Sequence, residues 1–273
     1  PSVGPGLILS DMISAGVPHI KLETIYRQSE NSYIPMLAKD IKNVNVTDDY
    51  LDKKDDYNFI SCDSKEIKNI LVQIVEKMQD KKIDLSNLQV LAPMYKGENG
   101  IDNLNIVFQE LINPKDKKKD EIKVGPITYR VGDKILNLVN DIDNNIYNGD
   151  IGYIKSIDIN SKKEPIVVEY DNNEVGYKRE NFNQITHAYA ISIHKSQGSE
   201  FMHVIMPITM GYSRMLYNKL LYTGVSRAKK SLVLLGDKDA FIKCVNNSYS
   251  LVRKTNLKLK IMNNLKINTQ NNK

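Results

Sequence analysis

The sequence predicts an α/β protein with a mainly parallel sheet and a small all-β barrel inserted into it. Three features predict this fold class. Short apolar strands alternate with stretches that repeat apolar residues at helical spacing. Over residues 127–180 the helical spacing disappears, and turn signals such as DNN, NGD and NS separate short strands. The alternation then resumes at Ile185, which indicates an insertion into one α/β domain.

The first helices are indicated by their end signals. Pro5 near the first turn and Gly16 as a stop predict a helix over 5–15. A second helix is predicted over 29–42, and Pro35 would kink it if this proline lay beyond the first turn. The other elements expected here are a strand over 20–22, an acidic surface loop over 47–58 and a strand over 59–62.

The rest of the α/β domain follows from capping residues and apolar spacing. Asp63 or Ser64 can cap a helix whose apolar residues recur at helical spacing from Ile67 to Met78. The predicted elements that follow are strands over 90–92, 204–206 and 232–235 and helices over 101–111, 188–195 and 218–226.

The insertion is bounded by a change of composition. A charge run over 115–123 reads as a solvated linker, and the strands after it suit a five-strand barrel of about 65 residues. Both ends of the insertion return to the α/β domain, so we expect that a short linker could replace it. The predicted domains are 1–114 with 184–250, the insertion 115–183, and a basic, Asn-rich tail over 251–273 that forms one helix.

Composition excludes several classes of protein. The apolar fraction is 41%, which supports a core and argues against disorder. The net charge of +5 permits nucleic-acid binding without requiring it. The 2 cysteines form no CxxC, and the 4 histidines form no HExxH, so we expect no metal site built from these side chains. No apolar run approaches the roughly 18 residues of a membrane helix, so we expect no membrane partner, and the cysteine usage fits the reducing cytoplasm.

Two arginines and one polar turn are candidates for phosphate chemistry, although no GxxxxGK[ST] cradle is present. Arg27, after a strand and beside Gln28, can direct a bidentate guanidinium into a cleft, or pair with a nearby glutamate on the surface. The turn over 190–201 groups polar donors around a glycine, as phosphate or sugar contacts require, but it can also be a plain helix-ending turn. Arg227 can act as an arginine finger, or as a basic residue favoured at a helix C-terminus.

Taken in order, these segments resemble the C-terminal half of a superfamily 1 helicase of the RecD-like type. The motif combination HKSQGSE with a downstream TGVSRA is specific, and the resemblance reaches to about residue 237. It implies a second RecA-like motor domain, a parallel sheet flanked by helices, with an SH3-like barrel as the insertion. The first 20 or so residues would then belong to, or link from, the first motor domain. The matching segments are PSVGPG at 1–6, YRQ at 26–28, LAPMYKG at 91–97, GIDNLN at 100–105, YRVGDK at 129–134, YNGDIG at 147–152, HKSQGSEF at 194–201 and YTGVSRA at 222–228.

The resemblance also implies a role for each matching residue. Arg27 and Arg227 would contact the γ-phosphate of ATP, with Gln28, Gly198 and Glu200 beside the nucleotide. ATP and Mg²⁺ would be bound mainly by an N-terminal motor domain of the same protein. The residues expected along single-stranded DNA are Tyr95, Lys96, Ser192, His194 and Lys195.

The function expected from this resemblance is ATP-dependent 5′→3′ DNA unwinding, in repair or recombination, by a longer protein. The chain opens on Pro1 in the middle of a motif and lacks the phosphate cradle, so we expect a fragment that is inactive alone. Two alternatives stay open. The protein can be a RecD-type subunit that works with nuclease subunits, or a non-catalytic DNA- or protein-binding module with a degenerate ATP site.

Overall fold

The structure is a computed structural model that describes residues 7–20, 32–171, 173–248 and 255–271. The chain forms two compact units, Glu30–Asn247 and a second unit made of Pro1–Ser29 with Ser248–Lys273. In the second unit, α1 (Ile8–Ser14) contacts α7 (Leu257–Asn271), and the Thr255 hydroxyl donates to Asp11 over 2.9 Å. Within the described ranges, every helix is too short or too polar to span a bilayer.

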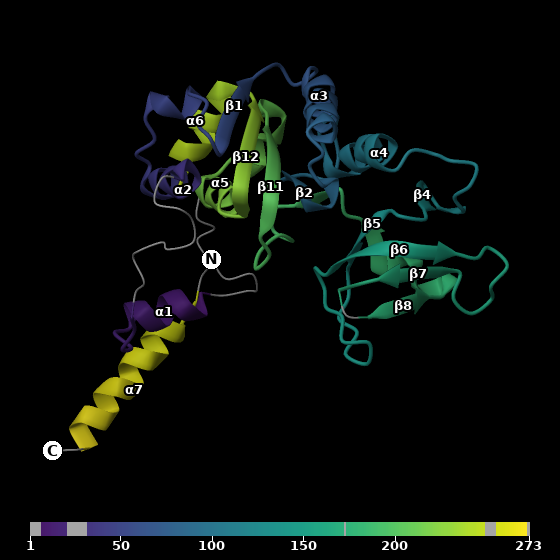
Figure 1. Cartoon of the computed structure of the whole chain (residues 1–273). Helices are drawn as coiled ribbons and strands as arrows, with labels where there is room; N and C mark the ends of the chain where they lie inside the picture. Colours follow the sequence, from purple (N-terminus) through teal and green to yellow (C-terminus); the bar gives the residue numbers. More distant parts are fainter. Residues whose placement is uncertain (1–6, 21–31, 172, 249–254, 272–273) are drawn as a thin grey trace. The chain divides into compact units, whose positions relative to one another are not determined.

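The larger unit contains a parallel five-stranded sheet, as the sequence predicts (Figure 1). Its strand order is β1-β12-β11-β2-β10. The strands read as continuous apolar runs because helices cover both faces of the sheet. Their bounds are β1 (Tyr57–Ser61), β2 (Leu88–Ala92), β10 (Ala190–Ser192), β11 (Phe201–Ile208) and β12 (Ala228–Gly236).

Two apolar cores lie on the two faces of this sheet. On one face, residues such as Leu37, Leu221 and Phe241 pack against Val204 and Met206 of β11. On the other face, residues such as Leu71 and Leu104 pack against Leu88 and Val90 of β2. The first face is covered by α2 (Tyr33–Asn43), α5 (Asn218–Val225) and α6 (Lys238–Asn246), and the second by α3 (Ile67–Asp80) and α4 (Ile101–Ile112).

The insertion is all-β, which confirms the predicted fold class. A hairpin of two strands precedes a five-stranded antiparallel sheet of order β8-β7-β6-β5-β9, with its own apolar core (Figure 1). The strands are β3 (Glu121–Val124), β4 (Ile127–Arg130), β5 (Lys134–Asn137), β6 (Ile151–Ile157), β7 (Ile166–Glu169), β8 (Glu174–Tyr177) and β9 (Ile185–His187). The predicted end of the insertion at residue 183 therefore falls just before β9, which pairs with β5.

The structure corrects three local predictions. Residues 188–195 form no helix: β10 runs from Ala190 to Ser192, parallel to β2, and a turn follows it. The predicted loop 47–58 contains a 3₁₀ turn, Asp48–Leu51, in which Tyr50 is buried, and the start of β1. The helix after Ser64 begins at Ile67 without a side-chain cap; instead the Glu66 carboxylate accepts from the Asp63 amide over 3.0 Å.

The predicted linker over 115–123 is also shorter than expected, because β3 begins at Glu121. The other predicted elements overlap those observed. Pro35 lies in the first turn of α2 and does not interrupt it. The tail forms α7, as expected. The predicted strand over 20–22 falls largely outside the described residues.

Candidate functional site

The sheet places the predicted site residues in two groups at its two ends. Because Ser192 pairs with Ala92, the segments that follow β10 and β2 leave the sheet side by side at its carboxyl end. They carry the predicted DNA residues. The segments that precede β11 and β12 meet at the amino end, where the Phe201 amide donates to the Arg227 carbonyl over 2.9 Å. They carry Gly198, Glu200 and Arg227.

At the amino end, Arg227 is half-buried and its guanidinium bridges α5 and the turn before β11. Nη1 donates to the Ser199 carbonyl over 2.9 Å, and Nη2 donates to Ser226 Oγ over 3.0 Å. Nε donates to the Thr223 carbonyl over 3.2 Å, in the last turn of α5. The contact with Thr223 is the one expected of a basic residue at a helix C-terminus. The contact with Ser199 also attaches the arginine to the residue that lies between Gly198 and Glu200 in the chain.

The turn before β11 is closed by its own serines. Ser196 Oγ donates to the Ile193 carbonyl over 2.8 Å, and the Ser199 amide donates to the Ser196 carbonyl over 3.1 Å. Gly198 has φ +92°, a conformation that favours glycine, and no atom lies within 4 Å of the position that a Cβ would take. This open space beside the backbone is the room that a phosphate or sugar would need.

Two further groups complete the amino-end cluster. Glu200 Oε2 lies 2.9 Å from Lys229 Nζ, in an ion pair that is partly open to water. Gln197 Oε1 is buried and accepts no hydrogen bond from the described residues. Sequence reasoning did not select Gln197 or Lys229. The motif residue Gln197 could have been found from the segment HKSQGSEF, but the pairing of Lys229 depends on the register of β11 and β12.

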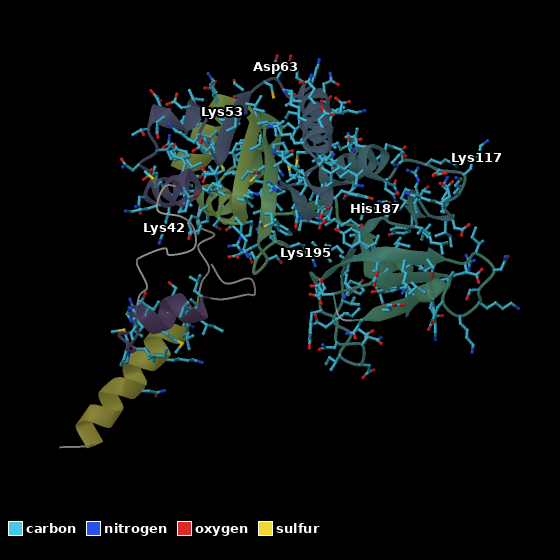
Figure 2. All side chains as sticks on the ribbon, in the orientation of Figure 1. Lys42, Lys53, Asp63, Lys117, His187 and Lys195 are labelled. Atoms are coloured by element: carbon cyan, nitrogen blue, oxygen red, sulfur yellow. The ribbon has the colours of Figure 1, made fainter. Side chains whose placement is uncertain are left out.

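At the carboxyl end, two lysines carry the positive charge of the DNA group. Lys96 Nζ lies 2.7 Å from Asp102 Oδ2 in an ion pair with an 88% exposed lysine side chain. Lys195 Nζ donates to Asn148 Oδ1 of the insertion over 2.6 Å (Figure 2 labels Lys195). Exposed ion pairs of this kind contribute little to stability, so Lys96 can exchange its partner at small cost. A phosphate would be a stronger acceptor for Lys195 than the neutral amide of Asn148.

The other three residues of the DNA group differ in exposure. Tyr95 is half exposed and can present its ring to a base. His194 Nε2 lies 3.1 Å from the Tyr217 hydroxyl. Ser192 is buried, and its Oγ accepts from the Lys195 amide over 3.2 Å, so it shapes the turn that presents Lys195. Arg27 and Gln28 lie outside the described residues.

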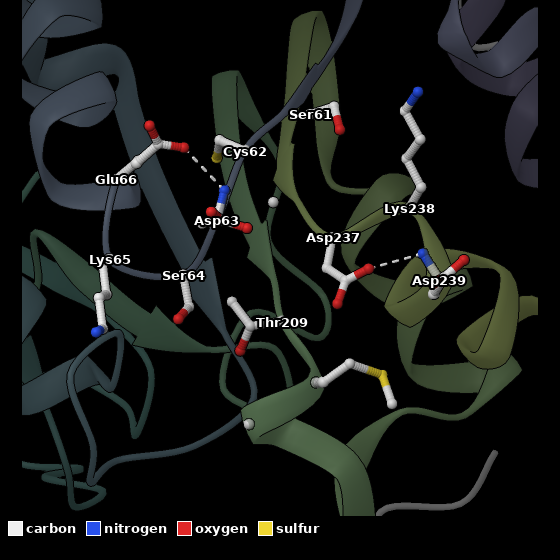
Figure 3. Close-up of a pocket in the computed structure, with 13 residues that line it drawn as sticks. Ser61, Cys62, Asp63, Ser64, Lys65, Glu66, Thr209, Asp237, Lys238 and Asp239 are labelled. Carbon is white, nitrogen blue, oxygen red and sulfur yellow. Dashed lines mark hydrogen bonds between the residues drawn. The ribbon is translucent and has the colours of Figure 1, made fainter.

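A hollow at the carboxyl ends of β1, β11 and β12 contains none of the predicted site residues. Its volume is about 710 Å³ (Figure 3). The Glu66 carboxylate accepts from the Asp63 amide over 3.0 Å, and the Asp237 carboxylate accepts from the Asp239 amide over 2.8 Å. The Asp237 carboxylate therefore already occupies the N-terminus of α6, which could otherwise bind a phosphate. Sequence reasoning gave no motif for this hollow.

Arg227 and the open backbone at Gly198 suit a phosphate group. Among the described residues, no cluster of three or more His, Cys, Asp or Glu side chains could hold a metal ion. A magnesium nucleotide would need further ligands.

Two family models match this chain. The SH3 domain of ATP-dependent RecD-like DNA helicases matches residues 104–170, and the UvrD-like helicase C-terminal domain matches residues 187–235. The first segment coincides with most of the insertion, and the second runs from the last residue of β9 through β10 and β11 nearly to the end of β12.

Curated relatives carry the same resemblance. An ATP-dependent RecD2 DNA helicase of Deinococcus radiodurans is 28% identical over 88% of this chain and 32% of its own length. A RecBCD enzyme subunit RecD of Buchnera aphidicola is 30% identical over 66% of this chain and 31% of its own. The chain thus spans about a third of the length of these relatives. A solved structure of Bacteroides Pif1 bound to single-stranded DNA is 20% identical, with a TM-score of 0.49 over 92% of this chain and 57% of that one.

Proposed function

Because this chain has the sequence of the C-terminal region of RecD-like superfamily 1 helicases, we propose that it is part of an ATP-dependent DNA helicase that moves 5′→3′ on single-stranded DNA. The two groups of site residues then have separate roles. The amino-end group contributes to ATP hydrolysis, and the carboxyl-end group contributes to the track for the strand. One RecA-like domain would thus link the two ligands.

The observation that carries this proposal is the contact between Arg227 and the Ser199 carbonyl. It attaches the guanidinium to the turn that carries Gly198 and Glu200, which are the other two described residues predicted to lie beside the nucleotide. Bound ATP with Mg²⁺ supplies the phosphoryl group that is transferred to water. Arg227, together with Arg27, would donate to the γ-phosphate and stabilise the charge that develops on it. Gln28 would lie beside the nucleotide and Glu200 near its ribose, and the N-terminal motor domain would provide the remaining contacts.

The DNA group suits a single strand because it combines cations with an exposed ring. Lys96 and Lys195 would bind phosphates, and Tyr95 or His194 would stack on a base. Ser192 would act through the turn that carries Lys195.

The test is Arg227→Ala in the longer protein. An arginine that acts mainly in the transition state should lower the rate of ATP hydrolysis by roughly 10³-fold while nucleotide binding is retained. Arg227→Lys should restore little of the rate of hydrolysis, because lysine lacks the planar guanidinium that donates two parallel hydrogen bonds. Arg179 is a matched control, because its Nη2 also donates to a backbone carbonyl, that of Ile159, over 2.7 Å. Near-normal DNA-stimulated hydrolysis by Arg227→Ala would remove Arg227 from the site.

The chain of 273 residues should not hydrolyse ATP at a helicase-like rate alone, because its described residues offer one side of the site. Hydrolysis at such a rate by the purified chain would contradict this division of labour. A DNA- or protein-binding module with a degenerate ATP site would instead show no hydrolysis even as the longer protein.

A second candidate is a subunit of a cytoplasmic nuclease complex. It is favoured by the relative from Buchnera aphidicola, which is a RecBCD enzyme subunit. Affinity purification of the longer protein from its source cells would decide. Nuclease subunits that elute in stoichiometric amount support this candidate, and a lone helicase that unwinds DNA excludes the requirement for them.

A further inference from the structure

One buried carboxylate lies at the junction between the insertion and the parallel sheet. Asp133 is 0% exposed, and both of its oxygens accept from side chains distant in sequence. Oδ2 accepts from Gln109 Nε2 over 2.6 Å and lies 3.0 Å from His187 Nε2. Oδ1 accepts from Asn113 Nδ2 over 2.7 Å and from the Tyr189 hydroxyl over 2.9 Å. Asp133 thereby joins α4 to the β9–β10 connection.

The surroundings of Asp133 favour its charged form. Burial by itself would raise the pKa of Asp133, but the interaction with His187 and the hydrogen bond from Asn113 outweigh burial and lower the pKa. A buried charge is tolerated only with its hydrogen-bond donors in place. Movement of the insertion away from α4 would therefore leave the buried carboxylate of Asp133 without its hydrogen-bond donors at the end of α4.

The residue after Asp133 makes a second attachment. Lys134 Nζ donates to the Ser86 and Leu88 carbonyls, each over 3.0 Å, at the start of β2. The Lys134 carbonyl accepts from the Ala188 amide over 2.8 Å. Only two residues, both buried, separate β9 from β10. This short connection therefore limits how far the insertion can move relative to the parallel sheet.

From this junction, β5 leads to the predicted DNA track. β5 begins at Lys134 and ends at Asn137, whose carbonyl accepts from the Gly149 amide over 2.9 Å. Asn137 Nδ2 also donates to the Tyr147 carbonyl over 3.0 Å. The next side chain, Asn148, accepts the bond from Lys195 Nζ over 2.6 Å. His187 and Lys195, the two ends of this path on the motor side, are labelled in Figure 2.

We propose that Asp133 is a positioning residue for the DNA track: it fixes β5 on the motor domain, and β5 holds Asn148 against Lys195. A phosphate that takes Lys195 would release Asn148, so the position of the insertion would depend on whether a strand is bound. This inference rests on the proposed function only for the assignment of Lys195 to the strand.

Amide hydrogen exchange of the 273-residue chain tests the positioning role. Asp133→Asn and Tyr189→Phe each remove part of the junction, and Tyr189→Phe does so without changing the carboxylate. We expect exchange to accelerate about fivefold or more at both 145–150 and 193–198, since one buried hydrogen bond is lost. Tyr212→Phe is the matched control, because Tyr212 is as buried as Tyr189, at 4%, and its hydroxyl donates to the Asn99 carbonyl over 2.5 Å instead.

The exchange of different segments distinguishes a folded variant, a supporting result and a contradicting one. Retained protection of β1 and β12 shows that a variant is folded, and if Asp133→Asn fails this criterion, Tyr189→Phe carries the test. Acceleration inside the insertion alone, with 193–198 exchanging at the rate of the unsubstituted chain, would overturn the proposal. So would an oligo-dT strand that slows exchange at 193–198 without accelerating it at 145–150. These readouts need no ATP hydrolysis, so a longer protein that fails to unwind DNA would refute the proposed function and leave this result standing.

Discussion

At the scale of single residues, Lys134 carries an ammonium group that folding removes almost completely from water. Burial lowers its pKa from 10.5 to about 8, and Asp84 opposes this only in part. Above about pH 8 the unfolded chain retains this proton and the folded chain loses it, so the contribution of Lys134 to stability rises with pH. Its burial is therefore unfavourable at neutral pH.

We predict that Lys134→Met abolishes this dependence. Between about pH 8 and 9.5, the free energy of unfolding of the unsubstituted chain should rise by about 2 kcal/mol relative to that of the variant. Urea unfolding at several pH values measures the difference, and other titrating groups cancel in it. Lys123→Met, at an exposed position of β3, should show no such difference. A constant difference for Lys134→Met would mean that the lysine stays protonated throughout.

Lys96 and Lys195 yield a second prediction at this scale. Lys96→Ala with Lys195→Ala should weaken binding of oligo-dT to this chain and flatten the dependence of log K on log salt. Each phosphate contact contributes a slope of about −0.7 for single strands, so the change should correspond to one or two contacts. Lys117→Ala with Lys118→Ala, in the exposed charge run, is the control. An unchanged slope in the first double variant would place the strand elsewhere.

Sequence reasoning selected candidate residues whose motif is local. The segments around Tyr95 and His194 were selected separately, and the pairing of β2 with β10 brings them together. Asp133 lay inside a matching segment but was not selected, because its donors lie up to 56 residues away along the chain. Asn148 was missed for the same reason: its contact with Lys195 spans 47 residues.

At the scale of elements, the segment 188–195 shows why short apolar runs are ambiguous. Its apolar residues satisfy both helical and strand spacing, and length alone favours neither. Ala190, Ile191 and Ser192 are all buried because the strand is covered on both faces, and pairing with β2 decides its conformation. The longer helices were predicted within a few residues because their end signals and apolar spacing agree.

The end of β12 yields a prediction about packing. Gly236 has φ +129°, and a Cβ there would lie 2.1 Å from the Ile208 carbonyl oxygen. Gly236→Ala should therefore lower the free energy of unfolding by about 2 kcal/mol or more, through backbone strain and the clash. Gly97→Ala is the control, since Gly97 has φ +106° but no atom within 4 Å of a Cβ. Equal urea midpoints for the two variants would show that the backbone of β11 at Ile208 moves aside without a loss of stability.

At the scale of the whole molecule, the structure changes what we expect when the insertion is removed. The sequence alone suggested a separable barrel. The buried junction indicates a different result. Replacing residues 116–179 by a short Gly/Ser linker removes Asp133, so the side chains of Gln109, Asn113 and Tyr189 lose their hydrogen-bond acceptor. Each unsatisfied buried group costs about 1–3 kcal/mol, a large share of a typical stability of about 5–15 kcal/mol.

We therefore predict that this deletion lowers the thermal midpoint markedly or abolishes cooperative melting, as circular dichroism would record. Replacing only the largely exposed turn 160–163 with Gly/Ser is the control and should leave the midpoint nearly unchanged. A deletion that melts like the unsubstituted chain would favour the separable barrel. The domain order was readable from composition, but the strength of this junction depends on contacts between distant segments.

The hollow at the ends of β1 and β12 has a practical use that follows from the burial of the two cysteines. Burial raises the pKa of both thiols, to about 12 for the buried Cys244, but Cys62 lines the hollow and is partly exposed to reagent. Because the thiolate is the reactive form, a maleimide dye should label Cys62 and spare Cys244 in the folded chain. The natural sequence thus offers a single attachment point for a fluorophore at the end of the sheet that bears the DNA group. Strand arrival could then be followed by fluorescence without introducing or removing any cysteine.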